Sequence, residues 1–266
     1  MARVTVEPYG ECLGSLLFPG AQKGKDCLQP MVLMAEQLLA LPPARQSRLL
    51  WRLDAGFGTD AGINWLLPRH CRLLVKGFNN RRAQKVVGQV PDADWIEVGP
   101  RKWAARVPNP VRYACRIETL ALDWFTGTGK EKCALLIHQL FDQSPAEIVR
   151  LYNARGGMET EIRDDKVGLQ LAKRRKHAWP AQAAWVVLTD VAHNLLKWTG
   201  DWMWHGSDFE GYGALRIVQD LLTIPGRVHF GGRKGDRLEP VALQRSHPYA
   251  RKMQSCLQRL FRELQP

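Results

Sequence analysis

The chain has 266 residues, of which 45% are hydrophobic and 24% are charged. This balance is typical of a folded protein with one large or two small domains, and it excludes disordered and collagen-like classes. No run approaches the ~20 apolar residues that cross a bilayer, and the first residues do not resemble a secretory leader. The six cysteines are scattered without a Cys-x-x-Cys pair, so we expect reduced thiols in the cytoplasm, not disulfides or a zinc site.

Positive charge is the first indication of a partner. The formal net charge is +12, and residues 226–266 carry nine bases against three acids. A second basic cluster contains Lys173, Arg174 and Arg175. Such surfaces attract polyanions, nucleic acid first among them, and a solvated basic face is the alternative.

Strand and helix signals alternate over the first eighty residues. The predicted elements are two short strands within residues 2–18, a helix over 31–41 that stops at Pro42 and Pro43, a strand over 48–54, a helix with Asp60 as its N-cap, and a strand over 72–76. The last three have the strand, helix, strand order of a βαβ unit.

The pattern changes after Trp95. Pro and Gly turns separate four β-like segments, at residues 95–98, 102–107, 111–119 and 132–138. We therefore expect a β-rich insertion in an α/β domain. From Pro145 the chain is mostly helical to about Leu222, and residues 183–198 are apolar almost all round, which predicts a buried helix. A hairpin over 227–243 and a helix over 247–264 complete the chain.

Four residues in one segment form a candidate catalytic motif. Tyr152, Arg155, Glu159 and Lys166 have the spacing Tyr-x2-Arg-x3-Glu-x6-Lys. On a continuous helix they would project within roughly 60° of one another, although the glycine pair at 156–157 weakens the case for continuity. A carboxylate between bases suits a metal-bound phosphodiester, because the acid holds the cation and the bases hold phosphate oxygens. A surface helix laced with salt bridges is the alternative.

This segment resembles the Tyr-Arg-Glu-Lys signature of the DDE transposases of bacterial insertion sequences, at all four positions. A second block, Trp51-Arg52-Leu53-Asp54-Ala55-Gly56-Phe57-Gly58, is similar to the strand end that holds the second catalytic Asp of that family. Similar blocks also lie at residues 65–67 with 76–78, and at 189–196. The resemblance covers most of the chain.

The resemblance implies a ribonuclease-H-like fold, in which a mixed sheet with helices is interrupted by an insertion between the second Asp and the Glu. The implied regions are a partial core (1–90), the β-rich insertion (91–142), the helical rest of the core (143–225) and a basic C-terminal hairpin and helix (226–266). Asp54 and Glu159 would be catalytic metal ligands, and two Mg²⁺ ions would support phosphoryl transfer.

The implied partner is double-stranded DNA at transposon ends. By the resemblance, Tyr152, Arg155 and Lys166 would hold phosphates there, and the cluster of Lys173, Arg174 and Arg175 is a further DNA-binding candidate. An intact enzyme would act as a homodimer on DNA in the bacterial nucleoid, with no membrane association.

One feature of the family pattern is missing. Its first catalytic Asp lies on the opening strand, and the only Asp before Asp54 is Asp26, in a segment that reads as a loop leading into a helix. We therefore expect the chain to lack the central first strand, and with it a metal ligand, which would leave it inactive and poorly stable alone. The rival reading is an inactive remnant that only binds DNA; a host nuclease on the same fold is a weaker third.

Other motifs have simpler interpretations. Residues 127–130, Gly-Thr-Gly-Lys, lack the flanking residues of a phosphate loop and predict a tight turn. Asp190, His193 and Asn194 share a helix face that could serve a metal, but hydrogen-bonded buried groups fit an apolar helix better. Glu161 is a rival for the third acid, at the wrong spacing. Of the ten tryptophans, Trp198, Trp202 and Trp204 are candidates for DNA contact.

Overall fold

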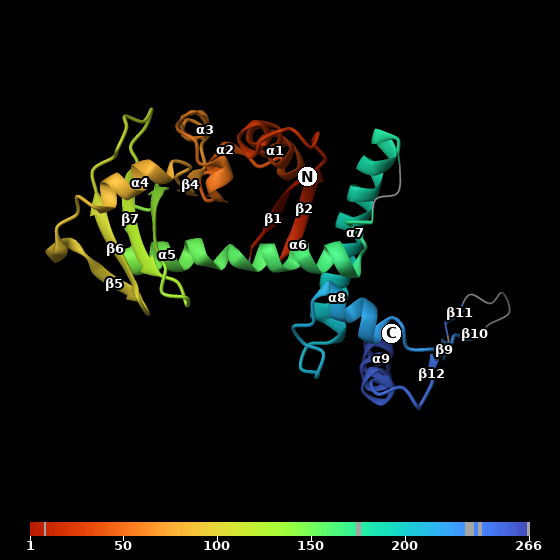
Figure 1. The fold of residues 1–266 in the computed structure, drawn as a ribbon. Helices are drawn as coiled ribbons and strands as arrows, with labels where there is room; N and C mark the ends of the chain where they lie inside the picture. Colours follow the sequence, from red (N-terminus) through yellow and green to blue (C-terminus); the bar gives the residue numbers. More distant parts are fainter. Residues whose placement is uncertain (8, 174–176, 232–236, 239–240, 265–266) are drawn as a thin grey trace. The chain divides into compact units, whose positions relative to one another are not determined.

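A computed structural model describes residues 1–7, 9–173, 177–231, 237–238 and 241–264. Apart from the first two residues, the chain divides into two compact units, one of residues 18–157 and one that joins residues 3–17 to residues 158–266 (Figure 1). Each unit has hydrophobic clusters of its own.

The unit of residues 18–157 contains one large sheet with helices around it. Its elements are α1 (Gly24–Leu39), α2 (Pro43–Gln46), β3 (Leu50–Leu53), η1 (Ala55–Phe57), α3 (Asp60–Leu66), β4 (Arg72–Lys76), α4 (Asn80–Val87), η2 (Asp92–Asp94), β5 (Ile96–Gly99), β6 (Lys102–Val107), β7 (Glu118–Phe125), β8 (Glu131–His138) and α5 (Pro145–Ala154).

The six strands are ordered β3-β4-β8-β7-β6-β5. β3 and β4 are parallel and are joined through α3, which confirms the predicted βαβ unit. β8 then pairs antiparallel with β4, and the remaining pairs are antiparallel. The β-like segments after Trp95 therefore extend the same sheet.

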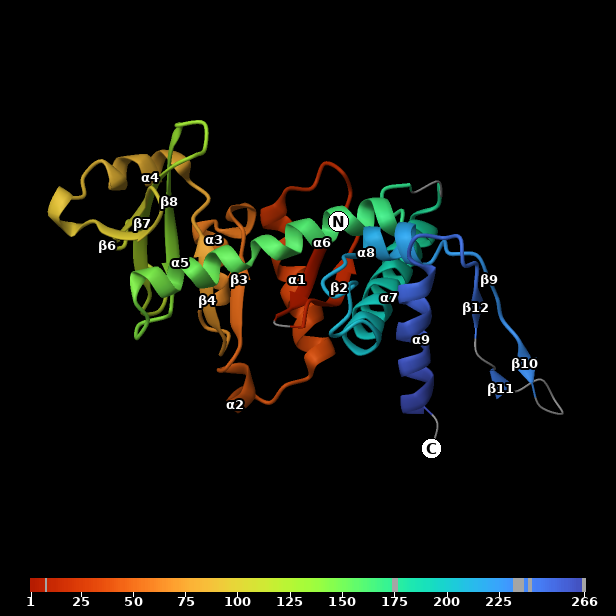
Figure 2. The same cartoon turned by 90° about the horizontal axis from the view of Figure 1, so that it is seen from below.

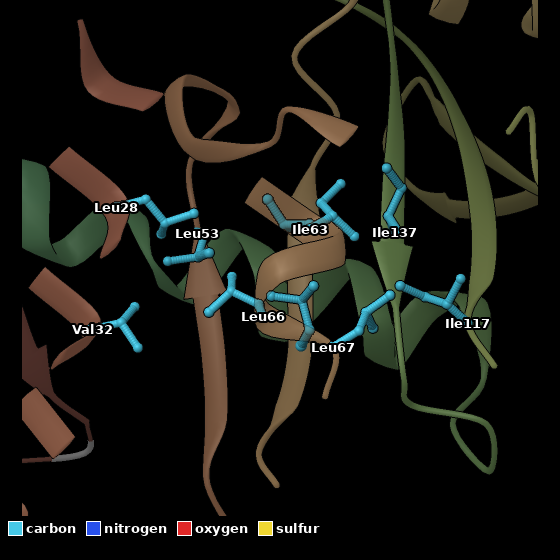
Figure 3. Packing of buried hydrophobic residues seen from close by; sticks show 10 residues of the cluster. Leu28, Val32, Leu53, Ile63, Leu66, Leu67, Ile117 and Ile137 are labelled. Carbon is cyan, nitrogen blue, oxygen red and sulfur yellow. The ribbon is translucent and has the colours of Figure 1, made fainter. Parts of the chain in front are cut away.

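Alternation along the strands gives the sheet two apolar faces. On one face, Leu53 and Ile137 pack with residues of α1 and α3, in the cluster drawn in Figure 3. On the other face, Leu120 and Leu136 pack with Ile148 of α5. Successive strand residues point to opposite faces, so α5 covers the face opposite to α1 and α3.

Local expectations in this unit hold in part. The predicted segment 111–119 is wrong, because the strand there runs over Glu118–Phe125, and the N-cap of α3 is Thr59, whose hydroxyl accepts from the Gly62 amide. Residues 126–130 form the predicted tight turn.

Helix α1 begins at Gly24 and contains Pro30. Since proline has no N–H, the Asp26 carbonyl instead accepts from the Gln22 side chain at 3.3 Å.

The second unit is mostly helical. Its elements are β1 (Ala2–Val6), β2 (Glu11–Leu16), α6 (Gly156–Gly168, whose first two residues belong to the other unit), α7 (Trp179–Met203), α8 (Ala214–Arg216), η3 (a π-helix, Ile217–Leu221), β9 (Gly226–Arg227), β10 (Phe230–Gly231), β11 (Arg237–Leu238), β12 (Ala242–Leu243) and α9 (Ala250–Leu264). β1 and β2 form a two-stranded sheet. The short strands β9 to β12 form a narrow extension (Figure 2).

The long helix α7 is buried on one face only. Val186, Thr189 and His193 are buried, and the helix packs on β2. Near its C-terminal end, Met203 and Trp204 pack with η3 and α9. Leu188 and Trp198, by contrast, are exposed. The expectation of a helix buried all round is therefore wrong for this second face: an apolar composition does not require each face to have a partner.

The chain has a mixed α/β architecture with a six-stranded mixed sheet, which is consistent with a ribonuclease-H-like fold. Among the described residues, the β1–β2 pair and the six-stranded sheet are separate sheets. All six cysteines are free thiols, as expected. Within the described ranges, no helix is long and apolar enough to span a membrane.

Candidate active site

Strand β3 presents Arg52 and the residue after its end, Asp54, on one side of the sheet. Leu53 points into the cluster with α1 and α3, so its neighbours on either side face α5. The Asp54 carboxylate accepts a hydrogen bond of 2.7 Å from the Ala55 amide, which starts η1. Its side chain is 51% exposed and therefore accessible to a ligand.

Helix α5 brings Tyr152 and Arg155 to the same side. Ser144 caps the helix and Pro145 occupies its first turn, while Ile148 packs onto the sheet. Tyr152 packs against the same cluster, and the Arg155 guanidinium lies 5.5 Å from the centre of its ring. Arg155 Nη2 lies 3.6 Å from Asp54 Oδ1, with only 14% of the arginine side chain exposed. Three residues predicted from sequence thus lie together within one unit.

Two further bases lie beside α5. Arg52 Nη1 donates to the Leu151 carbonyl at 2.8 Å, and Lys102 Nζ donates to the Asn153 side chain at 3.3 Å. Burial, and then the positive charge of Arg155, lower the pKa of Arg52. Burial and the charge of Lys76 lower the pKa of Lys102. Together with Arg155, these bases give the α5 side of the sheet a positive charge that attracts an anion such as phosphate.

Sequence reasoning missed both bases as site residues. Arg52 had a signal, because it lies two positions before Asp54 on a strand and shares its face. Lys102 had none, because its place beside Asn153 depends on how β6 and α5 pack on each other.

Glu159 and Lys166 lie on α6, and both are exposed. They belong to the unit of residues 158–266, whereas Asp54, Tyr152 and Arg155 belong to the other. The four signature residues do not lie on one continuous helix, because α5 ends at Ala154 and α6 begins at Gly156. Lys173 is exposed, and Arg174 and Arg175 lie outside the described residues.

The polar residues of α7 form a buried network. Asn194 bonds the backbone of Cys12, and Asp190 accepts from Arg3 at 2.8 Å and from Ser15 at 2.9 Å. His193 Nδ1 lies 3.0 Å from Asp165, which also pairs with Arg3. The interpretation as hydrogen-bonded buried groups is thereby confirmed.

Glu161, the alternative to Glu159 as the third catalytic acid, belongs to the unit of residues 158–266. It lines a cavity of about 450 Å³ together with Asp164, Lys197 and Tyr212. Burial raises its pKa, against the opposing effect of the Lys197 charge. Glu159 does not line this cavity, so the two acids have different surroundings.

The donor chemistry at Asp54 fits a hard divalent cation. Mg²⁺ prefers carboxylate oxygens and is commonly bound through one or two carboxylates together with substrate phosphates. Within the described residues, no group of three or more His, Cys, Asp or Glu side chains could hold a metal. Asp54 can therefore contribute to a metal site, with further ligands from another acid or from the substrate.

Comparison with known families decides the class of protein. A family model described as transposase DDE domain group 1 matches residues 10–265. The chain belongs to this family. A comparison with curated proteins gave no match. Membership of this family gives the transposase a role in DNA transposition, and it implies DNA as the substrate. Members of the family typically use a divalent metal.

Proposed function

We propose that this transposase cleaves and rejoins DNA strands at the ends of a bacterial insertion sequence, with Mg²⁺ as cofactor. Asp54 and Glu159 are the proposed catalytic metal ligands, and because the first Asp of the family pattern is not found in this sequence, the substrate or another acid would supply the remaining ligand. The observation that carries the proposal is the 3.6 Å approach of Arg155 to Asp54, which joins the two motifs that resemble the family. Membership of a DDE family supports the same chemistry.

The chain's own residues have distinct proposed roles. Arg155 offers a planar fork of N–H donors for two phosphate oxygens, and Lys166 offers a point charge. Tyr152 supports Arg155 through its ring and lies beside the same phosphates. Arg52 and Lys102 add positive charge next to α5, and the cluster of Lys173, Arg174 and Arg175 extends DNA binding outside the site. A bound divalent metal would activate the attacking oxygen and stabilise the leaving oxygen.

The partner in this proposal is double-stranded DNA, bound by a homodimer in the cytoplasm near the nucleoid. Since phosphate contacts release counterions, DNA affinity should fall steeply as salt rises.

Nicking of supercoiled plasmid carrying the element's ends tests this function. If the substrate or another acid supplies the missing metal ligand, nicking requires Mg²⁺ and stops with EDTA, whereas a site left without that ligand should give no nicking. Asp54→Asn and Glu159→Gln should each slow nicking by orders of magnitude while DNA binding persists. Asp142→Asn and Glu131→Gln change exposed acids on a loop and at the start of β8, and these controls should keep full activity. Salt-sensitive DNA binding without any nicking would instead identify a remnant that only binds DNA.

A further inference from the structure

Helix α7 carries an exposed apolar stripe. Its members are between 50% and 61% exposed: Leu188, Val191, Leu195, Trp198 and Trp202. Their spacing alternates between three and four residues. This average of 3.5 is the heptad repeat of a helix that packs along a second helix. The stripe continues toward the N-terminus of α7 in the small residues Ala184 and Ala181.

The stripe lies opposite to the part of α7 that its own unit buries. Val186, Thr189, Asp190 and His193 face that unit, and α7 packs on β2. If the stripe positions are a and d of a heptad, these buried residues fall at f, b, c and f. The two faces are therefore separate, and the stripe is not part of the core of its own unit.

The positions that flank the stripe favour a partner whose contacting surface is uncharged. The flanking e and g positions hold Trp185, Val187, Ala192, Asn194, Thr199 and Asp201. Only the last of them is charged, so two identical stripes would face little like-charge repulsion. The same lack of bases argues against DNA as the occupant, since DNA binding depends on Lys and Arg.

The size of the surface suits a second copy. Half of five large side chains amounts to on the order of 500 Å² per copy, and the flanking apolar residues bring this toward the ~800 Å² per partner of a stable interface. Trp198 is also held in place, because its indole N–H donates to the Glu11 carboxylate. An ordered aromatic side chain loses little conformational entropy on binding.

We propose that two copies of this chain associate through α7, with the stripe from Leu188 to Trp202 as a helix–helix seam. The seam is independent of the proposed metal chemistry, and it would also form in a catalytically inactive chain. It specifies a surface for the expected homodimer, and it forms without DNA.

The oligomeric state of the full chain in the absence of DNA tests the seam. Light scattering at micromolar concentrations should give twice the chain mass for the wild type and the chain mass for Leu195→Glu. Leu38→Glu changes an equally exposed leucine on α1 and should leave the dimer intact. A wild-type monomer up to about 100 µM, or a Leu195→Glu dimer, would overturn the proposal.

Cross-linking provides a second test that leaves the rest of the seam unchanged. Cys115 is the exposed native thiol, so Leu195→Cys is introduced together with Cys115→Ser. A short bismaleimide should then link two copies, whereas Leu38→Cys in the same background should give no linked dimer. Failure to link copies through residue 195 would count against the seam even if Leu195→Glu does not fold.

Discussion

The Arg155 guanidinium lies 3.6 Å from the Asp54 carboxylate, although about a hundred residues separate them in the chain. Asp54 follows a strand and Arg155 follows a helix that packs on the same face of the sheet. The contact therefore depends on the sheet and on α5 together. It leaves Asp54 half exposed. Arg52 of β3 and Lys102 of β6 donate hydrogen bonds to Leu151 and Asn153 of the same helix.

Lys102 should contribute to DNA affinity through a phosphate. Lys102→Gln removes one charge beside α5, so the slope of log affinity against log salt should fall by about one in magnitude. Fluorescence anisotropy across a salt series measures this slope. Lys85→Gln, on an exposed position of α4, should leave it unchanged; equal slopes for both variants would exclude Lys102 from the DNA interface.

Gly58 should be indispensable to the turn after Asp54. A Cβ at this position would lie 2.0 Å from the Lys76 carbonyl oxygen, whereas a Cβ at Gly56 would meet nothing within 4 Å. Gly58→Ala should therefore destabilise its unit by ~2 kcal/mol or more, because the backbone itself must move. Denaturant unfolding compares it with Gly56→Ala, which we expect to cost less than ~1 kcal/mol. Equal stability of the two variants would refute this packing.

His138 should make the sheet unit sensitive to acid. It is fully buried on β8, and burial lowers its pKa to about 4 from an unfolded value of 6.5. The folded state therefore excludes the imidazolium, so stability falls as pH drops below 6.5 and the loss is complete near pH 4. The loss amounts to ~3 kcal/mol.

Unfolding at pH 7 and at pH 5 checks this prediction in the wild type and in His138→Asn. The asparagine oxygen can accept the Leu140 amide that His138 Nδ1 accepts now, without titrating in this range. We expect the variant to lose the acid dependence. A wild-type stability that is flat between these pH values would contradict the assignment.

His193 should make the second unit less stable as pH rises, opposite to the effect of His138 on the sheet unit. Both of its ring nitrogens face acceptors at 3.0 Å, Asp165 and the Gly10 carbonyl, and only an imidazolium donates to both. Burial opposes the charge, but the bonds to Asp165 and Gly10 outweigh it and raise the pKa above 6.5. Arg3 and the charged His193 then balance the two buried acids, Asp165 and Asp190.

The stability that His193 contributes is full below pH 6.5 and is lost as pH rises through its folded pKa. Unfolding free energies between pH 6 and pH 9 should therefore decline in the wild type and stay flatter in His193→Gln. Nuclear magnetic resonance of the ring supplies a direct check. A neutral imidazole at pH 6 would be incompatible with the network as described.

The sequence predicted elements best where a short apolar run stands between turns. The strands at 72–76 and 102–107 were predicted at their observed bounds. β7 was not, because Leu120, Ala121 and Leu122 are all buried and give no alternation to set a boundary. The heptad stripe on α7 was also missed, because an apolar count does not distinguish a buried face from an exposed one.

The candidate site could be predicted only as separate pieces. The resemblance supplied Asp54, Tyr152 and Arg155, but no spacing in the sequence places Arg155 beside Asp54. Arg52 could have been predicted as a site residue from strand periodicity alone, because it shares the face of Asp54. Lys102 required the packing of β6 against α5, which involves residues about fifty positions apart. The roles of Glu159 and Lys166 stay predictions.

Cleavage by Asp54→Asn, by Glu159→Gln and by the double variant tests the central claim most directly. If both acids serve one metal-dependent reaction, each single variant should lose on the order of 10³-fold in cleavage rate, and the double variant should be no slower than the slower single one. Losses that multiply in the double variant, or a single variant that cleaves at the wild-type rate, would contradict a shared catalytic role for Asp54 and Glu159.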